Sequence, residues 1–275
     1  MIIDAHQHFW QLERGDYSWL TPELKLLYRD FMPDDLAPHL HQQRIDGTIL
    51  VQAAPTPAET QFLLEIADKT PFVLGVVGWT DFAAPSAAED IARLAQHPKL
   101  VGLRPMIQDI ADDDWMLRPA LAPAFEAMIQ ADLTFDALVI PRHLSRLRQL
   151  LSRHPKLRTV IDHAAKPDIA GGQFDEWAKD IAAIAKESGA FCKLSGLLTE
   201  AGSDWTEPEV APYIAHVLGQ FGSERLVWGS DWPVLTLVSN YGKWIELARS
   251  LIPTEPARSR IFGSNAMRLY RLPKK

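Results

Sequence analysis

The amino-acid sequence predicts an α/β protein folded as one (β/α)8 TIM-type barrel that spans residues 1–275 as a single domain. Short apolar runs rich in β-branched residues alternate along the chain with amphipathic helical patterns. Eight such runs occur, and they are apolar on both faces, which is typical of parallel strands. The length of 275 residues suits one barrel with a large buried core.

Eight strands are expected, each followed by a helix. In chain order, the predicted strands are residues 2–5, 48–53, 72–79, 100–104, 133–139, 159–163, 191–195 and 226–229. The clearest helical patterns follow strands four, six and seven, with apolar faces formed by Leu121, Phe125, Met128 and Ile129, by Phe174, Trp177, Ile181 and Ile184, and by Val210, Ile214, Val217 and Phe221. An open doubly wound sheet is the alternative fold, but its glycine-rich phosphate turn is missing after the first strand. The loops at 7–33 and 197–208 are candidate lids.

Composition limits the class of function. The chain is 47% hydrophobic and 23% charged, as expected for a globular enzyme or binding protein. Its net charge of −7 argues against nucleic-acid partners, which need a basic face, and Lys274-Lys275 is interpreted as a solvated tail. No signal peptide or membrane-spanning stretch is recognised, so we expect a cytoplasmic protein without a membrane partner. The single cysteine, Cys192, excludes an internal disulfide and lies in an apolar run that predicts a buried thiol.

Polar and titratable residues gather at the predicted carboxyl ends of the strands, where enzymes with this fold place their active sites. They are His6 and His8 on strand one, Arg104 on strand four, Asp136 on strand five, Asp162 and His163 on strand six, Lys193 and Ser195 on strand seven, and Ser230 and Asp231 on strand eight. Residues i and i+2 of a strand share one side, so the first two histidines can converge on one point. His39 and His41 have the same spacing within a helical pattern and are expected on a helix surface.

Each of these residues also has a structural explanation. His6 and His8 could be a hydrogen-bonded pair that closes the barrel mouth, His163 a core histidine beside Asp162, and Asp231 a helix cap or turn residue. However, strands one, six and eight are neighbours only in a closed barrel. We therefore predict that His6, His8, His163 and Asp231 form a catalytic site.

The chain also resembles the amidohydrolase superfamily, specifically the amidohydrolase 2 branch of sugar-lactone and aromatic-lactone hydrolases. The matching motifs are IIDAHQH at 2–8, VGLRP at 101–105, VIDHAAKP at 160–167, KLSGL at 193–197, WGSDWP at 228–233 and IFGSNAMRLYRL at 261–272. The resemblance spans nearly the whole chain. It implies a (β/α)8 barrel that hydrolyses C–O, C–N or P–O bonds, often with one or two divalent metals.

Carried over by position, the resemblance implies metal ligands at His6, His8, His163 and Asp231. Arg104 stands at the end of strand four, where binuclear relatives have a bridging lysine or glutamate, and Asp136 stands on strand five in place of their usual histidine. A binuclear centre is therefore not expected. Three imidazoles and a carboxylate suit a single zinc ion, but the branch includes lactonases that work without a metal. One divalent ion and no ion both remain open.

The resemblance implies hydrolysis of a lactone, which needs an activated water, a stabilised oxyanion and a proton for the leaving alkoxide. Asp231 is predicted to be the general base, while the three histidines, directly or through a metal, polarise the carbonyl. The residues predicted to bind substrate are Arg104, Asp136, Trp10, Trp232 and Lys166, the tryptophans as walls for a substrate ring. Arg104 could instead form an ion pair with an acidic residue such as Asp136, and Lys166 could simply shape its loop.

Within this branch, substrates include L-fuconolactone, L-rhamnonolactone and the aromatic pyrone dicarboxylate lactone. A dicarboxylate needs several cations at the strand ends, so we predict a neutral sugar aldonolactone such as L-fucono-1,5-lactone, opened in sugar-acid catabolism. The alternatives are a pyrone dicarboxylate-type lactonase, a metal-dependent decarboxylase of the same superfamily, a non-catalytic sugar-acid binder and an amidase-type hydrolase. A serine hydrolase is not expected, because no G-x-S-x-G turn occurs.

Overall fold

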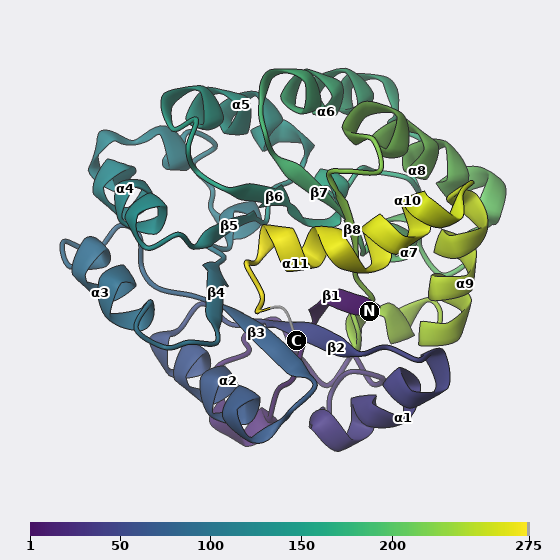
Figure 1. Cartoon of the computed structure of the whole chain (residues 1–275), viewed down its shortest axis with the longest axis horizontal. Coiled ribbons are helices and arrows are strands. Elements are labelled where there is room, and N and C mark those ends of the chain that lie inside the picture. The colour runs from purple at the N-terminus through teal and green to yellow at the C-terminus, as the bar shows by residue number, and fades with distance from the viewer. Residues whose placement is uncertain (274–275) are drawn as a thin grey trace.

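The computed structural model describes residues 1–273, which form one parallel sheet of eight strands in the order β1 to β8 (Figure 1). The strands are β1 Ile3–Gln7, β2 Gly47–Val51, β3 Val73–Gly78, β4 Leu100–Leu103, β5 Thr134–Ala137, β6 Thr159–Ile161, β7 Phe191–Leu194 and β8 Leu226–Trp228. The predicted eight strands are confirmed. The lysine pair at 274–275 lies outside the described residues.

The sheet closes into a barrel just beyond the end of β8. The backbone amide of Asp231 donates to the carbonyl of His6 at 2.8 Å, and the amide of His8 donates to the carbonyl of Trp232 at 2.8 Å. Gln7 and Trp232 form the corresponding parallel bridge. The bonds that close the barrel therefore fix the two predicted site segments, after β1 and after β8, against each other.

Helices surround the barrel (Figure 1), and at least one follows each strand, as predicted. The α-helices are α1 Pro33–Gln43, α2 Pro57–Lys69, α3 Ala87–Leu94, α4 Ala122–Gln130, α5 Leu144–Arg153, α6 Asp175–Glu187, α7 Leu197–Ala201, α8 Glu207–Phe221, α9 Tyr241–Leu251, α10 Glu255–Ser259 and α11 Asn265–Leu269. Helix α7 occupies the start of the second predicted lid loop. His39 and His41 lie on α1 as predicted, but only His41 is exposed, because the His39 ring stacks on Tyr241.

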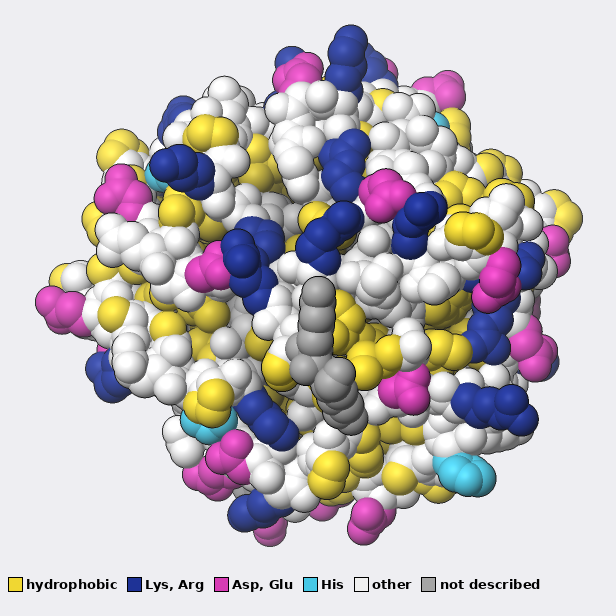
Figure 2. Space-filling model, viewed as in Figure 1, with side chains coloured by type: hydrophobic (Ala, Val, Ile, Leu, Met, Phe, Trp, Pro, Cys, Tyr) yellow, Lys and Arg dark blue, Asp and Glu magenta, His cyan; other side chains and the backbone are white. Residues whose placement is uncertain are grey.

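The chain after α9 covers the amino-terminal end of the barrel. Helices α10 and α11, joined by a π-helical turn, cross this opening (Figure 1). Leu269, Tyr270 and Leu272 pack against the apolar interior formed by Ile3, Val160 and other strand residues. Around this segment, side chains of both charge signs are scattered over the face of the molecule (Figure 2). The carboxyl end of the barrel is therefore the open end.

Two further expectations are tested by the structure. Cys192 is fully buried in β7, as its apolar surroundings predicted. No helix in residues 1–273 is long and apolar enough to cross a membrane.

Candidate active site

A cavity of about 740 Å³ opens at the carboxyl ends of the strands. His8, Arg104, His163 and Asp231 line its floor and inner wall, which brings residues from four of the predicted strand ends to one place. Ser18 and Trp19 come to its wall from the first predicted lid loop, and Thr199 and Glu200 from the second. Both segments predicted as lids therefore border the cavity.

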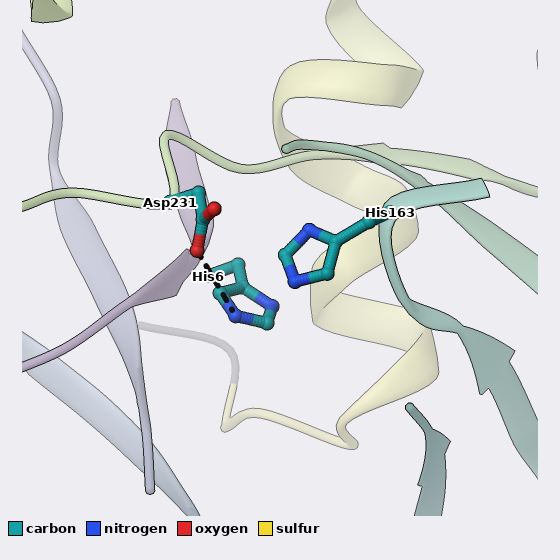
Figure 3. Close-up of side chains that lie close together, drawn as sticks. All are labelled: His6, His163 and Asp231. Carbon is teal, nitrogen blue, oxygen red and sulfur yellow. Dashed lines mark ion pairs between the residues drawn. The ribbon is translucent and has the colours of Figure 1, made fainter. Parts of the chain in front are cut away.

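The predicted histidines and aspartate converge. His6, His163 and Asp231 point toward one another (Figure 3), and each offers a ligand atom within 4.8 Å of the others. His8 joins this group through its Nε2, which lies 3.2 Å from Nε2 of His6 and 3.3 Å from Oδ1 of Asp231. These four residues form the centre of the candidate site.

A left-handed turn places His163. Strand β6 ends at Ile161, two residues earlier than predicted, and residues 163–166 all have positive φ, between 50° and 62°. None of the four is glycine, so this conformation costs about 1–2 kcal/mol per residue and must be held by tertiary contacts. The Trp177 indole donates to the carbonyl of Ala164 at 2.7 Å, and the amide of Lys166 donates to the carbonyl of His163 at 2.8 Å. The turn thus directs His163 and Lys166 to the cavity.

Small and polar neighbours hold His163 and Asp231 in place. Nδ1 of His163 lies 2.9 Å from the hydroxyl of Ser195, and Gly196 follows with a φ of 66°. On the other side, the buried carboxylate of Asp4 accepts the amide of Ser230 at 2.8 Å, which fixes the turn that carries Asp231. Burial raises the pKa of Asp4 to about 6.

A buried ammonium lies beneath His6. Nζ of Lys193 is 2.5 Å from Oδ2 of Asp136, 2.8 Å from Oδ1 of Asp162 and 3.1 Å from Nδ1 of His6. Burial raises the pKa of Asp136 to about 6. Burial also opposes the charge of Asp162, but Lys193 outweighs it and holds the pKa of Asp162 well below its ordinary value. Tyr270, which follows α11, donates to Asp136 at 2.7 Å and so joins this network to the segment that covers the amino-terminal end of the barrel.

Arg104 bonds to Asp162, not to Asp136. Its Nη1 donates to Oδ2 of Asp162 at 3.2 Å and lies 3.5 Å from Nε2 of His6, and its Nη2 donates to the carbonyl of Gln52. The ion pair with an acidic residue suggested from the sequence is therefore present, but its partner is Asp162 and not the example Asp136, beside which Lys193 lies. Arg104 is nevertheless on the cavity wall, so ion pairing and substrate contact do not exclude each other.

Hydrogen bonds fix the ring orientations of His6, in β1, and of His8, which follows it. An ammonium can only donate, so Nδ1 of His6 accepts from Lys193 and the proton of the neutral ring is on Nε2. Nδ1 of His8 lies 2.7 Å from the carbonyl of Val51, which can only accept, so Nδ1 of His8 carries a proton. Nε2 of His8 is therefore turned toward Nε2 of His6, at 3.2 Å, and toward the carboxylate of Asp231, at 3.3 Å.

The donor set fits one divalent ion. Burial lowers the pKa of His163 to about 4 and that of His6 well below its ordinary value, so both rings are neutral at neutral pH. Burial opposes the charge of Asp231, but His163 and the other imidazoles keep the pKa of Asp231 below its ordinary value, and the group is a carboxylate. For His6 to coordinate through Nε2, its proton must move to Nδ1, which lies 3.6 Å from the carboxylate oxygen Oδ1 of Asp162.

Three residues predicted to bind substrate lie behind the cavity wall. Trp10 is fully buried against Trp19 and Phe31, and Trp232 packs on Phe31. Asp136 lies inside the barrel and is also fully buried. Substrate contact by Trp10, Trp232 and Asp136 is not supported by this placement, because apolar packing and the ammonium of Lys193 already occupy their surfaces.

Other residues form the wall. Its aromatic part consists of Trp19, Trp79, Phe82 and Trp115. Its polar part includes Lys166, whose Nζ donates to Oε1 of Gln108 at 3.0 Å and lies 3.6 Å from Oε1 of Glu200. Neither Gln108 nor Glu200 was singled out from the sequence; the only signal was the position of Glu200 in a predicted lid loop.

Comparison with known proteins identifies the family. Residues 3–272 match the amidohydrolase family. An L-fucono-1,5-lactonase of Burkholderia ambifaria is 47% identical over 98% of this chain and 95% of its own length, and an L-fucono-1,5-lactonase of Burkholderia multivorans is 37% identical over 98% and 96%. A crystal structure of an amidohydrolase from Burkholderia multivorans with bound zinc is 34% identical, has a TM-score of 0.95 and covers 99% of this chain and 100% of its own. The family resemblance of the sequence motifs is confirmed: the chain belongs to the amidohydrolase family.

Proposed function

We propose that this protein is a lactonase that hydrolyses L-fucono-1,5-lactone or a related sugar aldonolactone. The observation that carries the proposal is the carboxylate of Asp231 in the floor of a cavity of about 740 Å³, beside the imidazole rings of three histidines. A cavity of this size accommodates a single sugar ring. The names of the two Burkholderia relatives support the same substrate.

Asp231 acts as the general base in this proposal. Its carboxylate takes a proton from a water molecule as the water oxygen attacks the lactone carbonyl carbon. The tetrahedral intermediate then breaks its bond to the ring oxygen, and the proton held by Asp231 passes to that alkoxide. The products are the open-chain hydroxy acid and the regenerated carboxylate, so no other reactant is consumed.

Positive charge and hydrogen-bond donors at the cavity floor stabilise the oxyanion. Arg104 reaches the wall beside the histidines and presents donors from a guanidinium that Asp162 and Gln52 hold in place. His8 and His163 line the same floor, and His6 supports His8 from behind. Donors that are already oriented lower the free energy of the transition state without reorganisation.

A single zinc ion is the proposed cofactor, with His6, His8, His163 and Asp231 as its ligands. When bound, such an ion would polarise the lactone carbonyl as a Lewis acid. The zinc in the Burkholderia multivorans amidohydrolase supports this choice, as do the ligand atoms of His6, His163 and Asp231, which lie within 4.8 Å of one another. Catalysis without a metal is the alternative, in which Arg104 supplies the positive charge.

The remaining expectations are proposals of the same kind. Arg104 and Lys166 are the proposed substrate-binding cations, because both line the cavity. We also propose one domain over residues 1–275, a cytoplasmic location and a small-molecule lactone as the only class of partner. The match to one family over residues 3–272 supports the domain assignment.

A pH-indicator assay with a panel of aldonolactones tests the function. Wild type should release acid, and Asp231→Asn should lose about 10²- to 10⁴-fold in kcat, the range expected for a general base. Metal analysis of the same samples reports the zinc content per chain. An enzyme that leaves every aldonolactone intact but releases CO₂ from an aromatic acid would overturn the proposal in favour of a decarboxylase.

A further inference from the structure

A polar clamp spans one side of the cavity. Gln108 lies in the 3-10 helix Ile107–Asp109 after β4, Lys166 ends the left-handed turn after β6, and Glu200 lies in α7 after β7. The single ammonium of Lys166 joins the other two, at 3.0 Å from Oε1 of Gln108 and 3.6 Å from Oε1 of Glu200. All three side chains line the cavity.

Another part of the lining is apolar. It consists of Trp19, Phe82 and Trp115 together with Val234 and Leu237. A pyranose ring has the same mixed character, because its C–H faces pack on aromatic rings while its hydroxyls require hydrogen-bond partners. The cavity therefore matches a polyhydroxylated ring better than an entirely apolar or entirely charged ligand.

The charges around the cavity disfavour an anionic substrate. Four carboxylates, those of Asp81, Asp109, Glu200 and Asp231, line it against two permanent cations, Arg104 and Lys166. Lys166 is already paired with one of these carboxylates, and Arg104 with Asp162. A lactone that carries carboxylate groups would meet net negative charge and two cations that are already paired.

We propose that Gln108, Lys166 and Glu200 together are the specificity-determining site of the enzyme and bind vicinal hydroxyls of an uncharged sugar lactone. This inference rests on the proposed lactonase function. The carboxylate of Glu200 can accept hydrogen bonds from two hydroxyls, the ammonium of Lys166 can donate to them, and the amide of Gln108 can do both. The clamp can therefore recognise a diol by complementary hydrogen bonds. None of the three residues takes part in proton transfer to the reacting ester.

The experiment compares two lactones in four proteins. Wild type, Glu200→Gln, Lys166→Met and the control Glu187→Gln are assayed on L-fucono-1,5-lactone and on δ-valerolactone, which lacks hydroxyl groups. Glu187 is exposed on α6 and, within residues 1–273, its carboxylate pairs with Arg148, so Glu187→Gln removes one ion-pairing carboxylate outside the cavity. If δ-valerolactone is not hydrolysed by wild type, it serves instead as a competitive inhibitor and its inhibition constant is compared.

Both clamp variants should lose about 10- to 100-fold in kcat/KM on the sugar lactone, mainly through a higher KM. Their kcat/KM on δ-valerolactone should stay within about twofold of wild type. The control variant should stay within about twofold of wild type on both lactones. Equal losses on both lactones would overturn the inference, because they would indicate a catalytic or structural role. Unchanged activity on the sugar lactone would overturn it as well, as would efficient hydrolysis of 2-pyrone-4,6-dicarboxylate by wild type. If wild type opens no lactone at all, the proposed function fails and the inference fails with it.

Discussion

Nζ of Lys193 lies 3.1 Å from Nδ1 of His6, with both groups completely buried. The same ammonium is held by two carboxylates, Asp136 and Asp162, so it cannot turn away from the imidazole without leaving a buried charge unpaired. A histidine at the centre of the site is thus oriented by a residue that the cavity never exposes. Stability and ring orientation are coupled through this one contact.

Replacing Lys193 by methionine should lower the free energy of unfolding by about 3–5 kcal/mol, because it leaves the buried carboxylate of Asp136 without a cation and that of Asp162 with Arg104 alone. Urea denaturation of the purified variant measures the loss. Asp136→Asn added to Lys193→Met removes the unpaired charge, so the double variant should be more stable than the sum of the two single effects predicts. Strictly additive effects would contradict the ion pairing.

Gly196→Ala should displace His163. A Cβ at this position would lie 2.5 Å from Nδ1 of His163, and the φ of 66° disfavours any residue with a side chain. We expect a loss of about 1–2 kcal/mol in stability and a larger proportional loss of lactonase activity. Gly189→Ala is the control, since nothing lies within 4 Å of its added carbon. Activity retained in Gly196→Ala would show that His163 is not required in its observed position.

Zinc binding should depend on the four central residues. Titration of metal-free protein with zinc is expected to show one site per chain, and Asp231→Asn should weaken its affinity at least about tenfold. Isothermal titration calorimetry measures the zinc affinity independently of enzymatic activity. Equal zinc affinity in wild type and Asp231→Asn would place any bound ion elsewhere.

The contribution of Glu59 to stability should fall as the pH rises from about 5 to 7. This residue of α2 accepts from the Tyr17 hydroxyl at 2.7 Å and from the amide of Ala53, and burial raises its pKa to about 7. The folded state therefore holds a proton that the unfolded state releases above its ordinary pKa of 4.5, which gives up to about 3 kcal/mol of extra stability at low pH that is lost by pH 7.

Glu59→Gln should remove this contribution, which is measured as the change in the pH dependence of stability, by urea denaturation at several pH values. Asp4 and Asp136, whose pKa values burial also raises to about 6, contribute in the same direction, whereas His6 and His163, whose pKa values burial lowers, contribute in the opposite direction. Glu65→Gln, an exposed change on the same helix, serves as the control and should leave the pH dependence unchanged. A pH dependence in Glu59→Gln equal to that of wild type would rule out the contribution of this buried carboxyl.

The sequence predicted the barrel and the centre of the site for a simple reason. Alternating apolar runs and amphipathic helices identify the strands locally, and a closed barrel then forces His6, His163 and Asp231 to meet. The left-handed turn at 163–166 was not predictable, because Ala164 and Ala165 have no local preference for positive φ and a distant bond from Trp177 holds them there. The partners of Lys193 were missed because they lie on other strands.

The cavity wall was the least predictable part. Trp19 and Trp115 reach it from irregular segments, where no periodic pattern indicates which way a side chain points. Trp10 and Trp232 looked equivalent in sequence, but they are buried one layer further back. Position near a strand end was therefore enough to predict where the site lies. Which side chains line its wall depends on the paths of the loops, which the sequence pattern does not indicate.

The segment that covers the amino-terminal end of the barrel has a consequence for biosynthesis. Residues 265–272 follow all eight strands in the chain, yet they pack against an interior to which β1, β2 and β3 as well as β6 and β8 contribute, and Tyr270 donates to Asp136. A nascent chain that has exposed every strand but not this segment would present an unsealed apolar interior to the surrounding solvent and chaperones. The bond from Tyr270 to the buried charge network can then form only after residues 265–272 have left the ribosome.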